Sequence, residues 1–187
     1  IVGNYVKIEA NREVKKENIT MPWEGLITGR LGITSSNLWK RSTLIKINGW
    51  DDVKSSQEYN LMFKILKFGG KIKFDSNYNT KKDHTRSDSI SNTNKTENIK
   101  RYIELRISIW KFLKNQQILT DNLNRILKII VFDSIKILYT ENKEAGVSLF
   151  NKYVSNEYTP LKSSSTSTFY LLLYKLFGFR LTQIILG

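Results

Sequence analysis

A chain of 187 residues with 40% hydrophobic and 12% aromatic side chains can bury a core, which excludes a disordered protein. It contains no cysteine, so a disulfide framework and a thiolate zinc site are excluded, and the reducing cytosol is the default compartment. The formal net charge of +13 indicates an anionic partner: nucleic acid, anionic lipid or a nucleotide diphosphate.

Residues 1–92 carry mixed strand and helix signals, whereas residues 93–187 indicate one helix after another, which predicts two parts. The first part is predicted to contain a strand at 1–8, a loop at 11–22, a helix at 24–30, a strand at 33–39 and a helix at 42–47. Asn48-Gly49 ends that helix, because both residues tolerate the left-handed conformation.

The next predicted helix begins at Ser55-Ser56-Gln57-Glu58, keeps its apolar residues at helical spacing and ends at Gly69-Gly70. Residues 71–74 then alternate charged and apolar side chains, as a half-buried strand does. The order of strand, loop, helix and strand favours an α/β domain.

The second part is predicted to contain helices at 96–114, 121–139 and 142–154, followed by an apolar segment at 169–186. The helix at 121–139 has the clearest apolar stripe, which we interpret as core: Leu123, Ile126, Leu127, Ile130, Val131, Ile137 and Leu138. In the apolar segment, Lys175, Arg180 and Gln183 interrupt the run of about 18 uncharged residues that a membrane span needs.

Five short motifs follow one another between residues 32 and 70: Thr34-Ser35-Ser36-Asn37, Trp39-Lys40-Arg41-Ser42, Asn48-Gly49-Trp50-Asp51-Asp52, Gln57-Glu58-Tyr59-Asn60-Leu61 and Gly69-Gly70. In this order they resemble the family-two glycosyltransferases of GT-A fold, especially bacterial enzymes that build surface polysaccharides. The resemblance covers residues 1–91 and includes Arg86-Ser87-Asp88-Ser89-Ile90-Ser91, which looks like the family's lid after its last strand. It implies a partial GT-A (nucleotide-diphospho-sugar transferase-like) domain at 1–92, followed by an α-helical extension at 93–187.

The resemblance assigns catalysis to Glu58. Inverting transfer needs a base within hydrogen-bond reach of the acceptor hydroxyl, and a carboxylate at a helix start is held rigidly for that task. Glu58 matches the second acid of the family's pair, which serves as the base, whereas Gln57 stands where the family usually has the first acid. The alternative is a capping box, Ser55-x-x-Glu58, in which the carboxylate bonds back to the helix start.

Short polar side chains and one tryptophan are candidates for binding sugars. Hydroxyl and amide groups suit a polyol site, although they also cap the end of a strand: Thr34, Ser35, Ser36 and Asn37. Trp50 suits stacking on an acceptor sugar, with a buried core tryptophan as the alternative. Asp51 and Asp52 are candidates for contacts with acceptor hydroxyls, with an Asx turn as the alternative.

Arg86 is the candidate for binding the donor diphosphate, because a guanidinium bonds phosphate oxygens in a bidentate manner; a solvated loop arginine is the alternative. His84, the only histidine, is the candidate metal contact in this chain, with a lone exposed histidine that has no role as the alternative. The family binds its nucleotide and its divalent cation, Mg or Mn, through an N-terminal half with an Asp-x-Asp-like motif. No Asp precedes Asp51, so we expect an inactive fragment whose cation and nucleotide are bound mainly by an absent half.

The implied activity is that of an inverting, hexosyltransferase-like enzyme that moves a sugar from a nucleotide-sugar donor to a glycan or lipid-linked acceptor. The basic helices after residue 92 and the apolar segment suit a cytoplasmic protein that lies peripherally on the inner face of the plasma membrane, with a solvated basic surface as the alternative. Rival interpretations are a non-enzymatic basic module that binds nucleic acid and a degenerate transferase that only acts as a scaffold. No nucleic-acid motif is present, so no nucleic-acid partner is expected.

Overall fold

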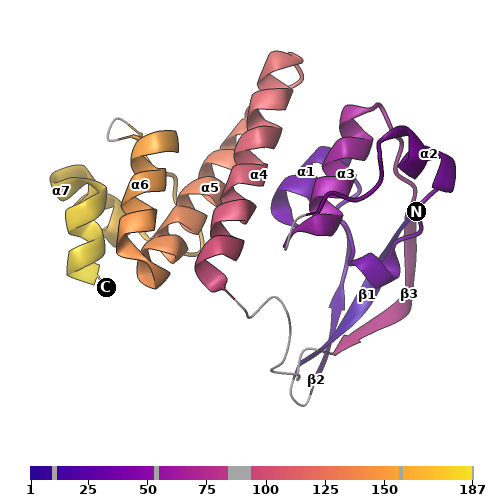
Figure 1. The fold of residues 1–187 in the computed structure, drawn as a ribbon. Helices are drawn as coiled ribbons and strands as arrows, with labels where there is room; N and C mark the ends of the chain where they lie inside the picture. The colour runs from indigo at the N-terminus through magenta and orange to yellow at the C-terminus, as the bar shows by residue number, and fades with distance from the viewer. Residues whose placement is uncertain (10–11, 53–54, 84–93, 156–157, 187) are drawn as a thin grey trace. The chain divides into compact units, whose positions relative to one another are not determined.

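The computed structural model describes residues 1–9, 12–52, 55–83, 94–155 and 158–186 (Figure 1). The chain divides into two compact units, Ile1–Thr93 and Asn94–Gly187. This division falls one residue after the change in sequence character at residue 92. Each unit is considered by itself below.

The first unit contains a mixed three-stranded sheet with the order β2-β1-β3. The central strand β1 (Val2–Glu9) pairs antiparallel with β2 (Arg12–Lys16) and parallel with β3 (Phe74–Asp83). Its side chains Val2 and Val6 are buried. The protein is therefore of α/β class, as predicted, although three strands do not distinguish a GT-A domain from other α/β folds.

Two strand predictions and one loop prediction in this unit were wrong or incomplete. Arg12–Lys16, predicted as loop, is strand β2, and β3 begins where the predicted strand at 71–74 ends. The side chains of both strands are exposed or only partly buried. Both strands form through backbone hydrogen bonds to β1, so their sequences do not need the apolar residues that favour strands. Within the predicted strand at 33–39, Thr34–Ser36 forms the 3₁₀ helix η1, and only Asn37 bridges to β1.

Three helices complete the first unit: α1 (Pro22–Thr28), α2 (Arg41–Lys46) and α3 (Gln57–Lys67). They lie together at one end of the strands in the view of Figure 1. Asn48 and Gly49 both have φ of 56°, which confirms that this pair ends α2 in the left-handed region. The apolar side of α3 packs against α2, with Ile47, Leu61 and Ile65 buried together.

The second unit contains α4 (Lys95–Asn115), α5 (Asp121–Glu141), α6 (Lys143–Tyr153) and α7 (Thr168–Leu186). Its core gathers around Phe132, whose ring centroid lies between 5.5 and 6.0 Å from four other rings, those of Tyr158, Tyr170, Tyr174 and Phe179. The predicted stripe of α5 is confirmed at its centre, since Leu127, Val131 and Leu138 are buried. Ile137 was wrongly placed in the core, because its side chain is 53% exposed.

The packing of α6 on α5 depends on Gly146, which is buried. A Cβ atom at Gly146 would lie between 2.6 and 2.8 Å from the N, Cα and Cβ atoms of Tyr139 in α5. These three atoms belong to the backbone and to the base of the Tyr139 side chain, so they cannot move away as the end of a flexible side chain would. An added Cβ atom would therefore force the two helices apart.

We expect Gly146→Ala to lower the free energy of unfolding by up to about 2 kcal/mol, because an overpacking cost of roughly 1–3 kcal/mol is offset by a helix-propensity gain of about 1 kcal/mol. Denaturant titration followed by circular dichroism measures this change. Ser148→Ala, at an exposed position of the same helix, is the control and should change stability by less than about 0.5 kcal/mol. A Gly146→Ala protein as stable as the parent would contradict the close approach of α6 to α5.

Candidate functional site

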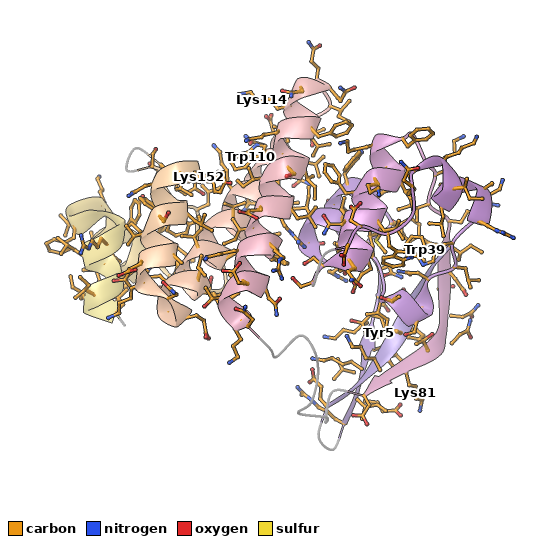
Figure 2. All side chains as sticks on the ribbon, viewed as in Figure 1. Tyr5, Trp39, Lys81, Trp110, Lys114 and Lys152 are labelled. Atoms are coloured by element: carbon orange, nitrogen blue, oxygen red, sulfur yellow. The ribbon has the colours of Figure 1, made fainter. Side chains whose placement is uncertain are left out.

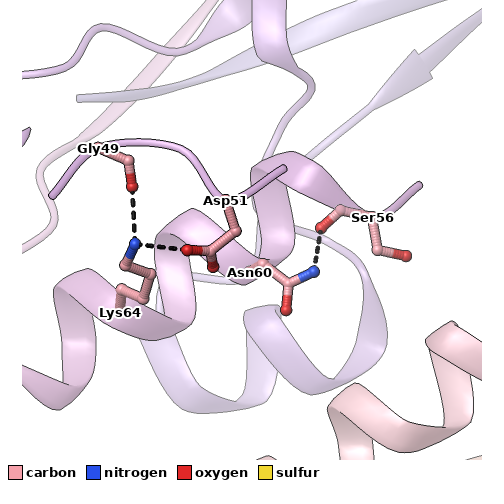
Figure 3. Close-up of polar contacts among 5 residues, drawn as sticks. All are labelled: Gly49, Asp51, Ser56, Asn60 and Lys64. Carbon is pink, nitrogen blue, oxygen red and sulfur yellow. Dashed lines mark hydrogen bonds and ion pairs between the residues drawn. The ribbon is translucent and has the colours of Figure 1, made fainter. Parts of the chain in front are cut away.

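The helix α3 holds together the chain segments that carry the predicted site residues. Figure 3 shows its polar contacts with the preceding turn. Lys64 donates hydrogen bonds from Nζ to the Gly49 carbonyl at 2.9 Å and to the Asp51 carboxylate at 2.8 Å. Asn60 donates from Nδ2 to the Ser56 carbonyl at 3.1 Å, which secures the first turn of the helix. The turn that contains Trp50 is therefore fastened to the side of α3.

Glu58 is the second residue of α3 and is half-buried. Among the described residues, its carboxylate has no hydrogen-bond or ion-pair partner. A carboxylate in the first helical turn interacts favourably with the helix dipole, an effect of roughly 0.3–1 kcal/mol that leaves its oxygens available. The first turn of α3 therefore presents a carboxylate that has no partner among the described residues.

The N-cap of α3 lies one residue later than the capping box given as the alternative for Glu58 requires. The residue that caps α3 is Ser56, with φ of 58° and ψ of 24°, and its side chain makes no capping hydrogen bond. A capping box would need Ser55 in that place, with Glu58 as the third helical residue. The left-handed conformation of Ser56 starts the helix one residue later and moves Glu58 to the second position.

Tyr59 fixes the start of α3, and sequence reasoning did not single it out. Its hydroxyl donates to the Gly29 carbonyl at 2.7 Å and lies 3.3 Å from the Gly32 carbonyl. These two carbonyls belong to the turn between α1 and η1, which precedes the predicted sugar-binding residues. Because Tyr59 follows Glu58 directly, its bond determines where the carboxylate lies relative to that turn. The only sequence signal for this contact was the position of a tyrosine next to the predicted base.

The four polar residues at 34–37 divide into two pairs. The Ser36 hydroxyl accepts a hydrogen bond from the Ile33 amide at 2.9 Å and lies 3.0 Å from the Ile33 carbonyl. Asn37 is 6% exposed and donates to the Leu31 carbonyl at 3.2 Å. Both side chains therefore stabilise the loop itself, which agrees with their alternative interpretation. Thr34 and Ser35 are exposed, so they are the two that can meet a ligand.

Trp50 is 41% exposed, so its interpretation as a buried core tryptophan was wrong. Its ring packs edge-on against Trp39, with the ring centroids 6.0 Å apart and the planes at 80°. This contact limits the motion of the indole while part of it stays in solvent, as a stacking surface for a sugar requires. Asp52 and Gln57 are also exposed, whereas Asp51 is engaged by Lys64.

The predicted phosphate and metal contacts, Arg86 and His84, lie outside the described residues. Within the described ranges, no group of three or more His, Asp or Glu side chains is placed to hold a metal ion. The Mg or Mn ion expected from the resemblance therefore has no ligand set in that part of the chain. The described residues supply a carboxylate, an aromatic surface and hydroxyl groups, which suit an acceptor rather than a metal-bound diphosphate.

Two hollows in the first unit lie away from Glu58. The smaller, of about 90 Å³, is lined by apolar residues that include Trp39 and Leu44. The larger, of about 400 Å³, is lined by polar groups that include Asn4, Glu17 and Asp75.

No protein family, no curated protein and no solved structure matches the chain. The function proposed below therefore rests on the geometry of the residues of the candidate site.

We expect Tyr59→Phe to lower the free energy of unfolding by about 1–2 kcal/mol, because two carbonyls lose their hydroxyl partner. Tyr78→Phe is the matched control. Its hydroxyl bonds to the exposed Glu17, so the change should stay below about 0.5 kcal/mol. Denaturant titration of both variants checks the difference. Equal stability of the two variants would show that the Tyr59 hydroxyl does not fasten α3.

Proposed function

We propose that this chain supplies the acceptor-side part of an inverting sugar-nucleotide glycosyltransferase of the kind that builds bacterial surface polysaccharides, with Glu58 as the base. One observation carries the proposal. Glu58 lies half-buried in the first turn of a helix whose start is fastened by Tyr59, and no described residue pairs with its carboxylate. A purely structural carboxylate at this place would be expected to cap the helix or to pair with a cation.

The reaction needs a proton acceptor at the acceptor hydroxyl. In an inverting transfer the hydroxyl oxygen bonds to the anomeric carbon of the donor sugar while the bond from that carbon to the nucleotide diphosphate breaks. Glu58 takes the hydroxyl proton as this happens, so charge does not accumulate on the attacking oxygen. A divalent cation, Mg or Mn, supplies charge neutralisation at the departing diphosphate in such transfers. The described residues give it no ligand set, so we assign it no step in this chain.

The acceptor contacts come from α3 itself and from the two segments that Tyr59 and Lys64 fasten to it. Trp50 offers a partly exposed ring for the apolar face of a sugar, and Asp52 is an exposed acceptor for sugar hydroxyls. Thr34 and Ser35 add exposed hydroxyls from the segment after the Tyr59 contact. Gln57 is neutral, so this helix start carries one carboxylate, that of Glu58.

We expect Glu58→Gln to reduce sugar transfer by about a hundredfold or more, which is the usual contribution of a general base. The measurement is release of nucleoside diphosphate from a panel of uridine and guanosine diphosphate sugars by the complete protein that contains this chain. Glu144→Gln is the matched control, because Glu144 is likewise the second residue of its helix, α6. Its variant should keep the parent rate within about twofold, since it shares only the helix-dipole interaction.

Unchanged transfer by the Glu58→Gln protein would remove Glu58 as the base. Absence of transfer from every donor by the unmutated protein would favour the scaffold interpretation instead.

We also propose that the protein lies peripherally on an anionic membrane surface in the cytoplasm, bound through α7. Among the described helices, only α7 is long and apolar enough to cross a membrane. One side of it packs into the core of the second unit through Tyr170, Tyr174 and Phe179. Its other residues form an exposed apolar surface: Phe169, Leu172, Leu176, Phe177, Leu181, Ile184, Ile185 and Leu186.

The chemistry of this surface favours a lipid interface. Lys175 and Arg180 are exposed within the same helix and can reach anionic head groups. Gly178, with φ of 70° and ψ of −176°, breaks the helix in the middle. A helix that is broken, packed on one side and apolar on the other suits an interfacial position better than a spanning one.

We expect the 187-residue chain to sediment with vesicles that contain phosphatidylglycerol and to remain free of pure phosphatidylcholine vesicles. Leu172→Glu combined with Leu176→Glu should reduce binding by about tenfold or more, because two apolar side chains of roughly 1.5–3 kcal/mol each no longer enter the lipid. Ile137→Glu is the control, since Ile137 is an equally exposed apolar residue of α5. Equal loss in both proteins, or equal binding to both vesicles, would contradict attachment through α7.

A further inference from the structure

A groove in the second unit is lined by residues that belong neither to the candidate site around Glu58 nor to α7. It has a volume of about 630 Å³ and is lined by residues of α4, of the following loop, of α5 and of the end of α6. This volume is within the range of sites that bind small molecules. Figure 2 labels three of its side chains, Trp110, Lys114 and Lys152.

The floor of the groove is apolar and partly aromatic. Ile107, Trp110, Leu119 and Tyr153 contribute to it. The indole N–H of Trp110 donates to the Asn124 Oδ1 atom at 3.1 Å, which holds the ring in one orientation. A ring held in this way provides a surface on which a planar or aliphatic group can lie at little cost in side-chain entropy.

The rim of the groove is positively charged. Lys111 and Lys114 lie three residues apart on α4, and Lys152 comes from α6. No Asp or Glu is among the described residues that line the groove, and the charge of Glu104 contributes to the raised pKa of Lys152. The Lys152 Nζ atom lies 4.9 Å from the centre of the Tyr153 ring, and its interaction with Tyr153 raises the pKa of Lys152.

The three ammonium groups have no ion-pair partner among the described residues. Like charges around one hollow repel each other, and a bound anion with several oxygens relieves that repulsion while it accepts charge-assisted hydrogen bonds. A phosphate group meets this requirement. The apolar floor beside the charges favours a phosphate that carries a non-polar or planar substituent.

We propose that the groove of Trp110, Lys111, Lys114, Leu119, Lys152 and Tyr153 is a binding site for an organic phosphate. The lysines bind the phosphate or diphosphate group, and the substituent lies on Trp110 and Leu119. Two sources share this chemistry: a soluble nucleotide, whose base stacks on the indole, and a lipid phosphate, whose chain covers the aliphatic floor. The site does not depend on Glu58 or on the proposed sugar transfer.

Isothermal calorimetry with the 187-residue chain at fixed ionic strength tests the proposal. The probes are decyl phosphate below its critical micelle concentration, uridine diphosphate, inorganic phosphate and the uncharged decyl maltoside. We expect decyl phosphate or uridine diphosphate to bind about tenfold or more tightly than inorganic phosphate, because the apolar floor adds to the charge interaction. Decyl maltoside should not bind. The tighter of the first two probes identifies the source as lipid or nucleotide.

Paired substitutions separate the groove from the general positive charge. Lys111→Gln with Lys114→Gln should weaken binding of the tighter probe by about tenfold or more, through loss of two charge-assisted contacts. Lys95→Gln with Lys162→Gln removes the same charge at exposed positions outside the groove and should change binding by less than about twofold. Trp110→Leu should weaken uridine diphosphate binding and spare inorganic phosphate. Equal weakening by the two lysine pairs, or no preference for either organic phosphate over inorganic phosphate, would overturn the proposal.

Discussion

The hydroxyl of Tyr59 is the contact on which the candidate site depends. It joins the first turn of α3 to the carbonyls of Gly29 and Gly32, beside the edge-on contact of the Trp23 ring in α1 with the Phe63 ring in α3. Lys64 makes the equivalent connection one turn later, to the Gly49 carbonyl and Asp51. Between them, these two side chains hold the segments before and after η1 against one helix. The half-buried Glu58 acquires a defined position from this arrangement, and that position is the basis of the proposed catalytic role.

The helices and the central strand β1 could be predicted from the sequence, since the strand predicted at 1–8 matches Val2–Glu9, whereas the outer strands of the sheet could not. The helices of the second unit follow from apolar residues at three- and four-residue steps, a pattern that reports burial directly. Strands β2 and β3 contain few apolar residues, and their formation depends on hydrogen bonds to β1. Pairing of this kind joins residues far apart in the sequence, such as Val6 and Lys81. The local composition of a strand therefore does not predict it. The conformation of Ser56 was missed for a similar reason, because the surrounding loop determines its φ angle.

The sequence indicated which positions belong to the candidate site, but not what each side chain contacts there. Trp50 is 41% exposed, so its interpretation as a buried core residue was wrong. Glu58 is the second residue of α3, and the N-cap is Ser56 rather than Ser55. Ser36 and Asn37 instead bond to their own loop, since short polar side chains satisfy nearby backbone groups as readily as they bind sugars. The contact of Tyr59 and the groove around Trp110 arise from tertiary packing, so no motif indicated them. The residues that line the proposed anion site all belong to the helical unit.

The central claim is that Glu58 acts on the reacting hydroxyl rather than on binding or folding. Single-turnover transfer by the complete protein, with donor and acceptor already bound, isolates the chemical step from both. If Glu58 is the base, its replacement by Gln leaves the dissociation constants of donor and acceptor within about twofold and slows the single turnover by about a hundredfold or more. A single-turnover rate equal to that of the parent protein, or a loss explained entirely by weaker binding, would contradict the account.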